Sequence, residues 1–444
     1  MHYKRLLSFI DSASSYLSVG LDVGADFTWM SIALPNGSFV GKPFKIIHSD
    51  PRSRDLAVAK IKEAQETYSL KSRCFLESTG IYHIPLLCFL RDKGFDCSVI
   101  NPIITKNSTN INIRKLHNDK FDSKKAALVG LNVSLKTSII PDDSVVDLRN
   151  LVRDYYFKDR QSAVALKLTA ELKVSFPAYA KVFSKVTIQS SLKLLSSYPL
   201  PEDMLAASKE NIVDIIRSTA RFGEAYALRK YEAIIAAAKD AAVFGRALPS
   251  NAVRIRLYVD TYQEYQKHLD TLLKALHETV EKLQDTLIYD QICLLQSLRG
   301  IGFLSAVVLI AEMGDFKLFS SPKKLYAYFG LDPAVKQSGK LNGDKVHMSK
   351  RGSSLARRIL HMAALNNVKV SKGSGTPVNP VIYDYYTQKR AGKKKPVAMG
   401  AVMHKICNII FAMLRDKKPF EIITPEEHCR HFAAKHPDKI RKSA

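Results

Sequence analysis

The sequence has little of what stabilises secreted and membrane proteins. Its six cysteines are scattered along 444 residues without a C-x-x-C pair, which argues against a zinc site and a disulfide framework and favours a reducing cytoplasm. No uninterrupted apolar run reaches the roughly 18 residues of a membrane span. The apolar stretch 6–10 is too short for the core of a signal peptide. We therefore expect a cytoplasmic protein that has no membrane partner.

Acidic residues are also few. The chain has 42 Asp and Glu against 67 Lys and Arg, a formal net charge of +25. With 46% apolar and 25% charged residues, it is not a disordered chain. So large an excess of positive charge indicates a polyanionic partner, and counterion release makes nucleic acid the natural one. An anionic membrane surface is the weaker alternative, because the sequence shows no basic amphipathic helix of that type.

The length predicts two or three domains. Residues 1–145 alternate strand and helix signals, with a hairpin turn at Pro35-Asn36-Gly37. Three antiparallel strands followed by strand–helix–strand units predict an α/β domain with a mixed sheet. The expected strands are 17–23, 29–34, a strand ending near 46, 72–77 and 95–100, with helices at 52–69 and 84–93.

The rest of the chain is expected to be mainly helical. Residues 146–292 end in a heptad pattern from Val259 to Leu287, which predicts either a dimerising coiled coil, slightly favoured, or a helix pair within the chain. Residues 182–249 match nothing that we recognise. Residues 293–444 contain most of the charge, with 27 Lys and Arg against 10 Asp and Glu from residue 291 onward. We expect nucleic acid to be bound there.

Four carboxylates in the first domain form a pattern. Asp22 and Glu77 end two of the expected strands, and Asp119 and Asp122 lie three residues apart at the start of an expected helix. An i,i+3 pair lies on one helix face, so all four acids can face one another. Such oxygen ligands suit Mg²⁺ or Mn²⁺, and two such ions can clamp a phosphate. Taken singly, Asp22 is more typical of a turn or a helix cap, and Asp119 and Asp122 are also typical of a solvated helix start. Glu77 is more informative, because a short apolar strand rarely ends in a carboxylate.

Two features of the third segment point to phosphate chemistry. Gly300 and Gly302 form a Gly-x-Gly turn between expected helices, whose backbone N–H groups can bind phosphate. Ser338 lies beside a glycine in a loop between Lys336 and Lys340, where its hydroxyl can approach a phosphodiester. Composition alone favours a plain helix turn and a plain polar loop.

Several short runs resemble a known family. They are Gly-Leu-Asp (20–22), Leu-Glu-Ser-Thr-Gly-Ile-Tyr (76–82), Val-Ile-Asn-Pro (99–102) and Asn-Asp-Lys-Phe-Asp-Ser-Lys-Lys-Ala (118–126). The pattern and the order of the acids are similar to the RuvC/RNase H superfamily, and within it to the DEDD transposases of bacterial insertion-sequence family one-ten, related to the Piv and MooV DNA invertases. That family usually has Lys-Thr-Asp-x-x-Asp-Ala, where this chain has Asn118 and Ser123 in place of Thr and Ala. The resemblance implies that Asp22, Glu77, Asp119 and Asp122 are the catalytic, metal-binding set.

The third segment resembles the C-terminal domain of the same family. Gly-Leu-x-Pro (330–333), x-Ser-Gly (337–339), Met-Ser-Lys-x-Gly (348–352) and Leu-x-Arg-Arg-x-Leu (355–360) follow its pattern. The serine before the first glycine is the family's nucleophile and maps to Ser338, whereas Ser349, Ser353 and Ser354 match other positions. Expected nucleic-acid contacts are Gly300, Gly302, Lys336, Lys340, Lys350, Arg351, Arg357, Arg358, Lys393, Lys394 and Lys395.

The resemblance implies a transposase that cuts and rejoins donor and target DNA through a phosphoserine, with Mg²⁺ at the acidic site. It further implies a structured non-coding bridge RNA as guide, a homo-oligomer (a dimer, and a tetramer in the synaptic complex) and a place on the bacterial nucleoid. The alternatives are a RuvC-like metal-dependent nuclease or junction resolvase and a Piv-like invertase without guide RNA. A non-enzymatic scaffold is disfavoured by the complete set of acids and serine.

Overall fold

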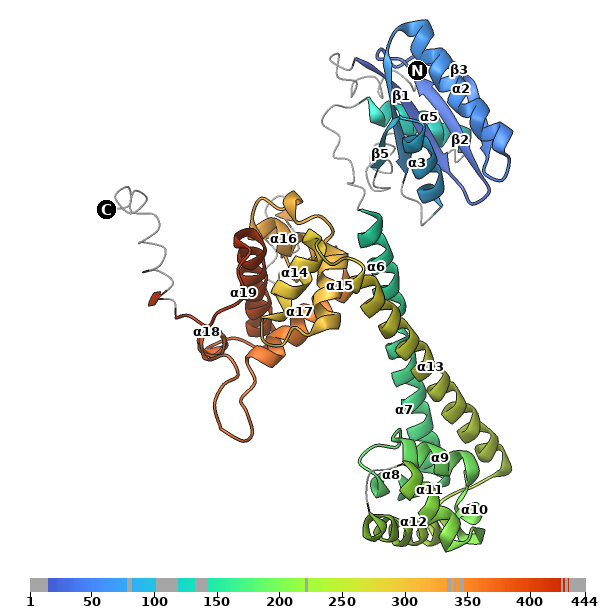
Figure 1. Ribbon diagram of the computed structural model, residues 1–444, viewed down its shortest axis with the longest axis vertical. Coiled ribbons are helices and arrows are strands. Elements are labelled where there is room, and N and C mark those ends of the chain that lie inside the picture. Colours follow the sequence, from blue (N-terminus) through green and yellow to red (C-terminus); the bar gives the residue numbers. More distant parts are fainter. Residues whose placement is uncertain are drawn as a thin grey trace. The chain divides into compact units, whose positions relative to one another are not determined.

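The chain divides into two compact units, Met1–Pro141 and Asp142–Ala444 (Figure 1). A computed structural model describes residues 15–77, 82–100, 119–131, 142–219, 223–333, 347–424, 426–427 and 430, and the backbone of 337–338 and 341–342. Each unit has its own hydrophobic core and is described by itself.

The N-terminal unit contains a five-stranded mixed sheet. Its strands are β1 (Tyr16–Val23), β2 (Phe27–Ala33), β3 (Phe39–Ile47), β4 (Lys71–Glu77) and β5 (Asp96–Ile100), in the order β3-β2-β1-β4-β5. The first three strands pair antiparallel, while β4 pairs parallel with both β1 and β5. This confirms the mixed α/β sheet expected from the sequence.

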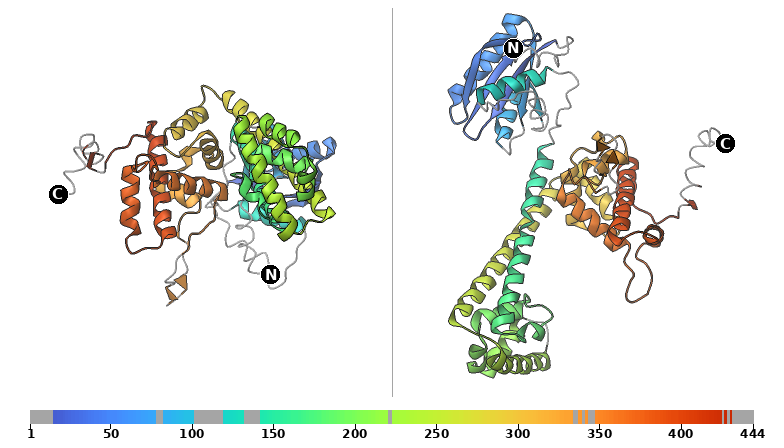
Figure 2. Two further views of the ribbon diagram at one scale, coloured as in Figure 1. Left: turned by 90° about the horizontal axis from the view of Figure 1, so that it is seen from below. Right: turned by 180° about the vertical axis from the view of Figure 1, so that it is seen from behind.

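Helices cover both faces of this sheet. Helices α2 (Pro51–Tyr68) and α3 (His83–Asp92) pack on one face, and α5 (Asp119–Gly130) lies on the other (Figure 2). The β2–β3 connection is the expected tight turn, in which Gly37 has a φ of +83°. The Asn36 side chain accepts a hydrogen bond from the Ser38 backbone N–H at 2.9 Å. The Asn-Gly pair suits such a turn, because glycine adopts a positive φ without steric cost and the asparagine side chain hydrogen-bonds to the backbone two residues on.

The described elements between residues 143 and 296 are all helices. Helix α6 (Asp143–Asp154) leads into α7 (Phe157–Ser175), and the 33-residue α13 (Pro249–Glu281) runs back along both. The segment between α7 and α13, which matched nothing recognised in the sequence, forms a cluster of helices. These helices share one hydrophobic core with α7 and α13. Its helices are α8 (Tyr179–Val182), α9 (Gln189–Ser197), α10 (Pro201–Ala206), α11 (Lys209–Thr219) and α12 (Glu224–Phe244).

The heptad seam of α13 is buried within the chain, not between chains. Val259 packs in the core shared with α7, whereas Leu276 and Val280 pack with Leu148 and Val152 of α6 in the core of the C-terminal helices. The favoured expectation of a dimerising coiled coil is therefore wrong for these positions, and the intramolecular helix pair is correct. A lysine at Leu276, which is 0% exposed, would disrupt this core rather than split a dimer.

The C-terminal helices surround a second core. Helix α19 (Lys395–Asp416) is, among the described helices, the one long and apolar enough to cross a membrane by length and composition. Its Val402, Ile406 and Ile410 are nearly fully buried in this core, as in a central helix of a soluble domain. The helices are α14 (Leu287–Gln296), α15 (Phe303–Met313), the 3₁₀ turn η2 (Phe316–Leu318), α16 (Pro322–Tyr328), α17 (Ser354–Asn367), α18 (Pro380–Arg390) and α19 (Lys395–Asp416).

Candidate active site

Strand periodicity places two of the four acids on the sheet face that α5 covers. In β1, Leu17, Val19, Leu21 and Val23 belong to the core beneath α2 and α3, so Asp22 points to the opposite face. Glu77 follows Leu76, which belongs to the same core, and therefore also faces α5. Strands β1 and β4 are parallel neighbours with Leu21 opposite Leu76 in register. The two carboxylates consequently occupy adjacent positions at the ends of adjacent strands.

Helix α5 lies unusually close to β1, and Gly20 makes this possible. A Cβ at Gly20 would overlap the backbone N of Ala127 and the carbonyl O of Ser123. Hydrogen bonds hold the helix there: Ser18 Oγ donates to the Ala127 carbonyl at 2.6 Å, and the hydroxyls of Ser31 and Ser123 lie 2.8 Å apart. Close approach brings the first turn of α5, with Asp119 and Asp122, to the end of β1.

Replacing Gly20 with alanine should therefore damage both stability and the site. The added methyl group must push α5 away from the sheet, and overpacking of this kind costs about 1–3 kcal/mol. We expect a lower denaturant midpoint for the N-terminal unit and weaker Mn²⁺ binding by calorimetry. Gly373→Ala is the matched control, because nothing lies within 4 Å of its added Cβ. Equal stability of the two variants would contradict the close packing of α5.

The four carboxylates act on one another electrostatically. The pKa of Asp22 is raised from 3.8 to about 7, first by burial and then by the negative charges of Asp122, Asp119 and Glu77; Lys125 opposes this rise. Lys125 Nζ lies 2.7 Å from Asp122 Oδ1. Lys125 was not among the residues expected at the site, although its i,i+3 spacing from Asp122 indicates such a contact.

The raised pKa of Asp22 has a consequence for stability. Because the folded state holds the Asp22 proton up to about pH 7 while the unfolded chain releases it near pH 4, this group destabilises the fold as pH rises through that window. In chelator at pH 8, Asp22→Asn should therefore melt at a higher temperature than the native protein, and at pH 4 the difference should vanish. Thermal denaturation at both pH values measures it. A lower melting temperature for the Asn variant at pH 8 would contradict the raised pKa of Asp22.

The acidic set suits a divalent cation in its chemistry. Four carboxylates from two strand ends and one helix turn are hard oxygen ligands, of the kind that Mg²⁺ and Mn²⁺ prefer. Within the described ranges, no three His, Cys, Asp or Glu side chains are arranged so that they could hold an ion as they stand. Binding would therefore require the carboxylates to approach one another further.

The expected nucleophile lies in a short two-stranded ladder. Ser338 is in β6 (Gln337–Ser338), which pairs antiparallel with β7 (Leu341–Asn342), where a loop was expected; its side chain lies outside the described residues. The ladder has an ordered base. Pro333 and Met348 form a β-bridge, and the Ser349 backbone N–H donates to the Asp332 carbonyl at 2.7 Å. The Ser349 hydroxyl also donates to the Asp332 carboxylate, so this serine closes the base of the ladder.

Two family models match the sequence on either side of the central helices. The DEDD transposase model matches residues 19–177, which include all four acids. The model described as "Transposase IS116/IS110/IS902 family" matches residues 293–386, which include Ser338. Together they cover more than half of the chain. The chain belongs to the IS110 family of transposases.

Curated relatives agree with this family. The chain is 27% identical over 309 residues to the insertion element IS900 42 kDa protein of Mycobacterium paratuberculosis, covering 67% of this chain and 72% of that protein. It is 24% identical over 322 residues to the insertion element IS110 43.6 kDa protein of Streptomyces coelicolor, covering 69% and 73%. A pilin gene-inverting protein of Moraxella bovis is 31% identical over 129 residues, 29% of this chain and 38% of that protein.

The nucleic-acid contacts expected from the sequence of this transposase divide into two groups. Arg357 and Arg358 have partners within the chain: Arg357 Nη1 donates to the carbonyls of Phe329 and Gly352, and Arg358 Nη1 donates to both carboxylate oxygens of Asp159 at 2.8 and 2.7 Å. Arg357 therefore supports the turn before the serine ladder. Arg358 joins α17 to the start of α7.

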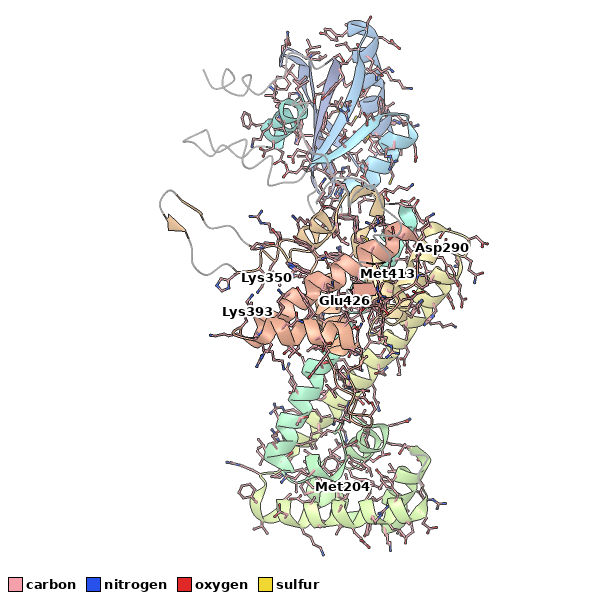
Figure 3. The ribbon with its side chains drawn as sticks, turned by 90° about the vertical axis from the view of Figure 1, so that its left-hand side faces the viewer. Met204, Asp290, Lys350, Lys393, Met413 and Glu426 are labelled. Atoms are coloured by element: carbon pink, nitrogen blue, oxygen red, sulfur yellow. The ribbon has the colours of Figure 1, made fainter. Side chains whose placement is uncertain are left out.

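Gly302 and the exposed basic residues before α17 and α19 are better placed for phosphate. Gly302 caps the N-terminus of α15 with open space around it, whereas Gly300, at a φ of +87°, packs against Asn366. Exposed lysines occupy the start of α19, where the helix dipole is also positive. Two positive contributions at one place favour the binding of an anion there. Figure 3 labels Lys350, which precedes α17, and Lys393, which precedes α19. Lys350, Arg351, Lys393, Lys394 and Lys395 are exposed, while Lys336 and Lys340 lie outside the described residues.

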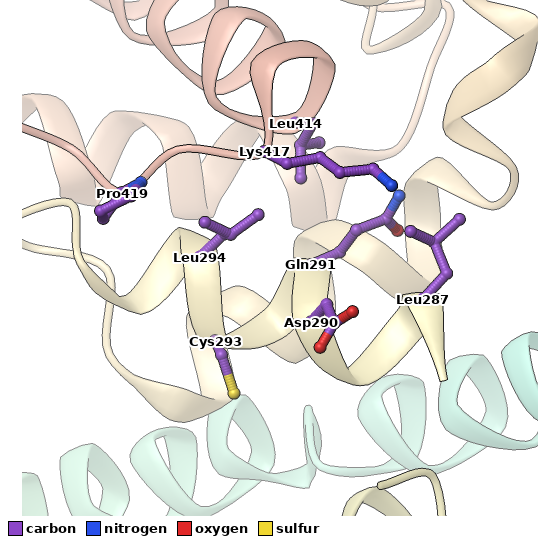
Figure 4. A pocket seen from close by; sticks show the side chains of 8 residues that line it. All are labelled: Leu287, Asp290, Gln291, Cys293, Leu294, Leu414, Lys417 and Pro419. Atoms are coloured by element: carbon purple, nitrogen blue, oxygen red, sulfur yellow. The ribbon is translucent and has the colours of Figure 1, made fainter. Parts of the chain in front are cut away.

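One pocket opens between α14 and the end of α19 (Figure 4). It has a volume of about 400 Å³ and offers Asp290, Gln291 and Lys417 among apolar side chains. None of the residues expected from the sequence to bind or cut nucleic acid lines it, so we assign it no part in the reaction.

Proposed function

We propose that this transposase cuts and rejoins DNA at the ends of its own insertion sequence, with Ser338 as nucleophile and the four carboxylates as a Mg²⁺ or Mn²⁺ site. The observation that carries the proposal is the convergence of Asp22, Glu77, Asp119 and Asp122: burial, and then the charges of the other three acids, raise the Asp22 pKa. A structural role gives no reason to gather four acids at one end of a sheet, since their repulsion costs stability. A cation bound between them removes that cost.

The chain's own groups have defined tasks in this reaction. Ser338 Oγ forms a bond to phosphorus as one bridging P–O bond breaks; the serine proton passes to solvent, and the departing deoxyribose oxygen takes up a proton. The cut strand remains attached as a phosphoserine, and a hydroxyl end of another strand reverses the step. Mg²⁺, when bound, polarises the phosphate and stabilises its developing charge. The carboxylates hold that ion, and the base of the ladder holds the serine.

Sequence specificity is assigned to a structured bridge RNA. Positive charge in the C-terminal part contacts phosphates, which positions nucleic acid but reads no bases. Pairing of RNA loops with donor and target would supply the sequence reading, as in other RNA-guided systems. We further propose a homodimer that forms a tetramer on paired DNA ends in the bacterial nucleoid.

Reconstitution tests this function. The purified full chain, Mg²⁺, a donor junction and a target are incubated with and without RNA transcribed from the DNA flanking the gene. We expect joined products only with that RNA, and none with an RNA whose two loops are scrambled. Recombination at the same sites without RNA would instead favour a DNA invertase, the activity named for the Moraxella relative. Cut but unjoined DNA would favour a metal-dependent nuclease.

A further inference from the structure

A lysine already occupies part of the acidic site. Lys125 Nζ lies 2.7 Å from Asp122 Oδ1, and the lysine and aspartate side chains are only 13% and 27% exposed. A lysine is seldom so buried unless its charge is paired. Its positive charge also acts on Asp22 against the three other acids. One oxygen of the Asp122 carboxylate, a group that would help to hold a metal ion, is therefore already paired with an ammonium group.

The neighbouring lysine on α5 shows that this contact is specific. Lys124 Nζ lies 5.0 Å from the centre of the Phe39 ring, so its side chain is directed to β3. Lys125 follows Asp122 by three positions, which places its side chain on the helix face that carries the site acids. Two adjacent lysines of equal length thus have different environments, and one can serve as the control for the other.

We propose that Lys125 is a built-in counter-ion that competes with the divalent cation for Asp122. This inference rests on the proposed metal-binding function. The ammonium offsets part of the repulsion among the four carboxylates and keeps Asp122 in place. A divalent ion binding at Asp122 must displace Lys125, because two cations at one carboxylate oxygen repel each other. Lys125 is accordingly a positioning residue that sets the metal affinity of the site.

An ordinary helix-surface ion pair makes a different prediction. An exposed i,i+3 pair contributes about 0.2–0.5 kcal/mol to helix stability and has no reason to alter metal binding. Competition predicts opposite signs for two measured quantities: removal of the lysine charge weakens the fold without metal and strengthens metal binding. No purely structural role gives this combination.

The test compares Lys125→Met, Lys125→Arg and the control Lys124→Met in the full chain. In calorimetric titration, the dissociation constant for Mn²⁺ should be at least about tenfold lower for Lys125→Met than for the native protein, which corresponds to about 1.4 kcal/mol of binding free energy. Lys124→Met should bind like the native protein. Lys125→Arg keeps a cation at Asp122 and should bind no more tightly than the native protein. In chelator, Lys125→Met should melt at a lower temperature than the native protein. Addition of Mn²⁺ should raise the melting temperature of Lys125→Met by more than it raises that of the native protein.

The possible failures are distinguishable. If the native protein binds Mn²⁺ and Lys125→Met binds it equally or more weakly, Lys125 is not a competitor, while the proposed function stands. If the native protein binds no Mn²⁺ and Asp22→Asn behaves identically, the metal-dependent function fails and this inference fails with it. Should Lys125→Met not fold, the order of the native protein and Lys125→Arg decides: tighter binding by the arginine variant would overturn competition.

Discussion

Alanine in place of Asp22 or Asp119 is expected to reduce DNA strand cleavage by about 10³-fold or more, since a misplaced charge-stabilising group alone costs 10²–10³ in rate. Both acids come from the convergent set, and each would hold the ion that stabilises charge on the phosphate. DNA and RNA binding should change little, because lysine and arginine contacts to phosphate dominate affinity. Cleavage of end-labelled junction DNA and filter binding of the same DNA measure the two quantities.

Asp55→Ala is the matched control for the acid variants. Asp55 is an exposed carboxylate in the second turn of α2, on the sheet face opposite α5. It should cleave like the native protein. Cleavage at the native rate by Asp22→Ala or Asp119→Ala in Mg²⁺ would remove the acids from the mechanism.

Alanine in place of Ser338 is expected to abolish strand exchange completely. Without the hydroxyl no phosphoserine forms, and the energy of the broken phosphodiester cannot be kept for rejoining. Recombined product on a plasmid substrate should be absent even after long incubation. DNA binding by the variant should remain, because a serine contributes no charge to it.

Ser349→Ala gives the comparison that separates the nucleophile from its support. Ser349 donates to the Asp332 carboxylate at the base of the ladder. Loss of a hydrogen bond to a charged group costs about 1.5–3 kcal/mol. This variant should therefore recombine at least about tenfold more slowly and still form joined product. If Ser349→Ala were inactive and Ser338→Ala active, the two assignments would have to be exchanged.

Strand alternation made much of the acidic site predictable from the sequence. Successive residues of a strand point to opposite faces of the sheet, so an acid that follows a core-facing residue must lie on the other face. Asp22 follows Leu21 in this way, and Glu77 follows Leu76. The i,i+3 spacing did the same for the acids of α5. What spacing could not give was distance: the close approach of α5 depends on Gly20, and its role appears only when the helix is packed on the strand.

Partners far apart in sequence were the least predictable feature. Arg358 reads as part of a basic helix, yet its charge pairs with Asp159, which lies 199 residues earlier. The heptad pattern of α13 likewise predicts that one helix face is apolar, but it does not predict which element covers that face. That face is covered by α6 and α7 of the same chain. Periodicity defines a buried face, and only the fold defines its partner.

A trapped protein–DNA adduct tests the central claim most directly. A substrate nicked near the crossover loses a short strand after attack, so an attached protein cannot rejoin it. We predict that the native protein forms a denaturant-stable adduct in Mg²⁺ and that the DNA-linked peptide of this adduct contains Ser338. The adduct should be absent in chelator and absent with the Glu77→Gln variant. DNA cut without any covalent species, or an adduct whose linked residue is not Ser338, would contradict the account.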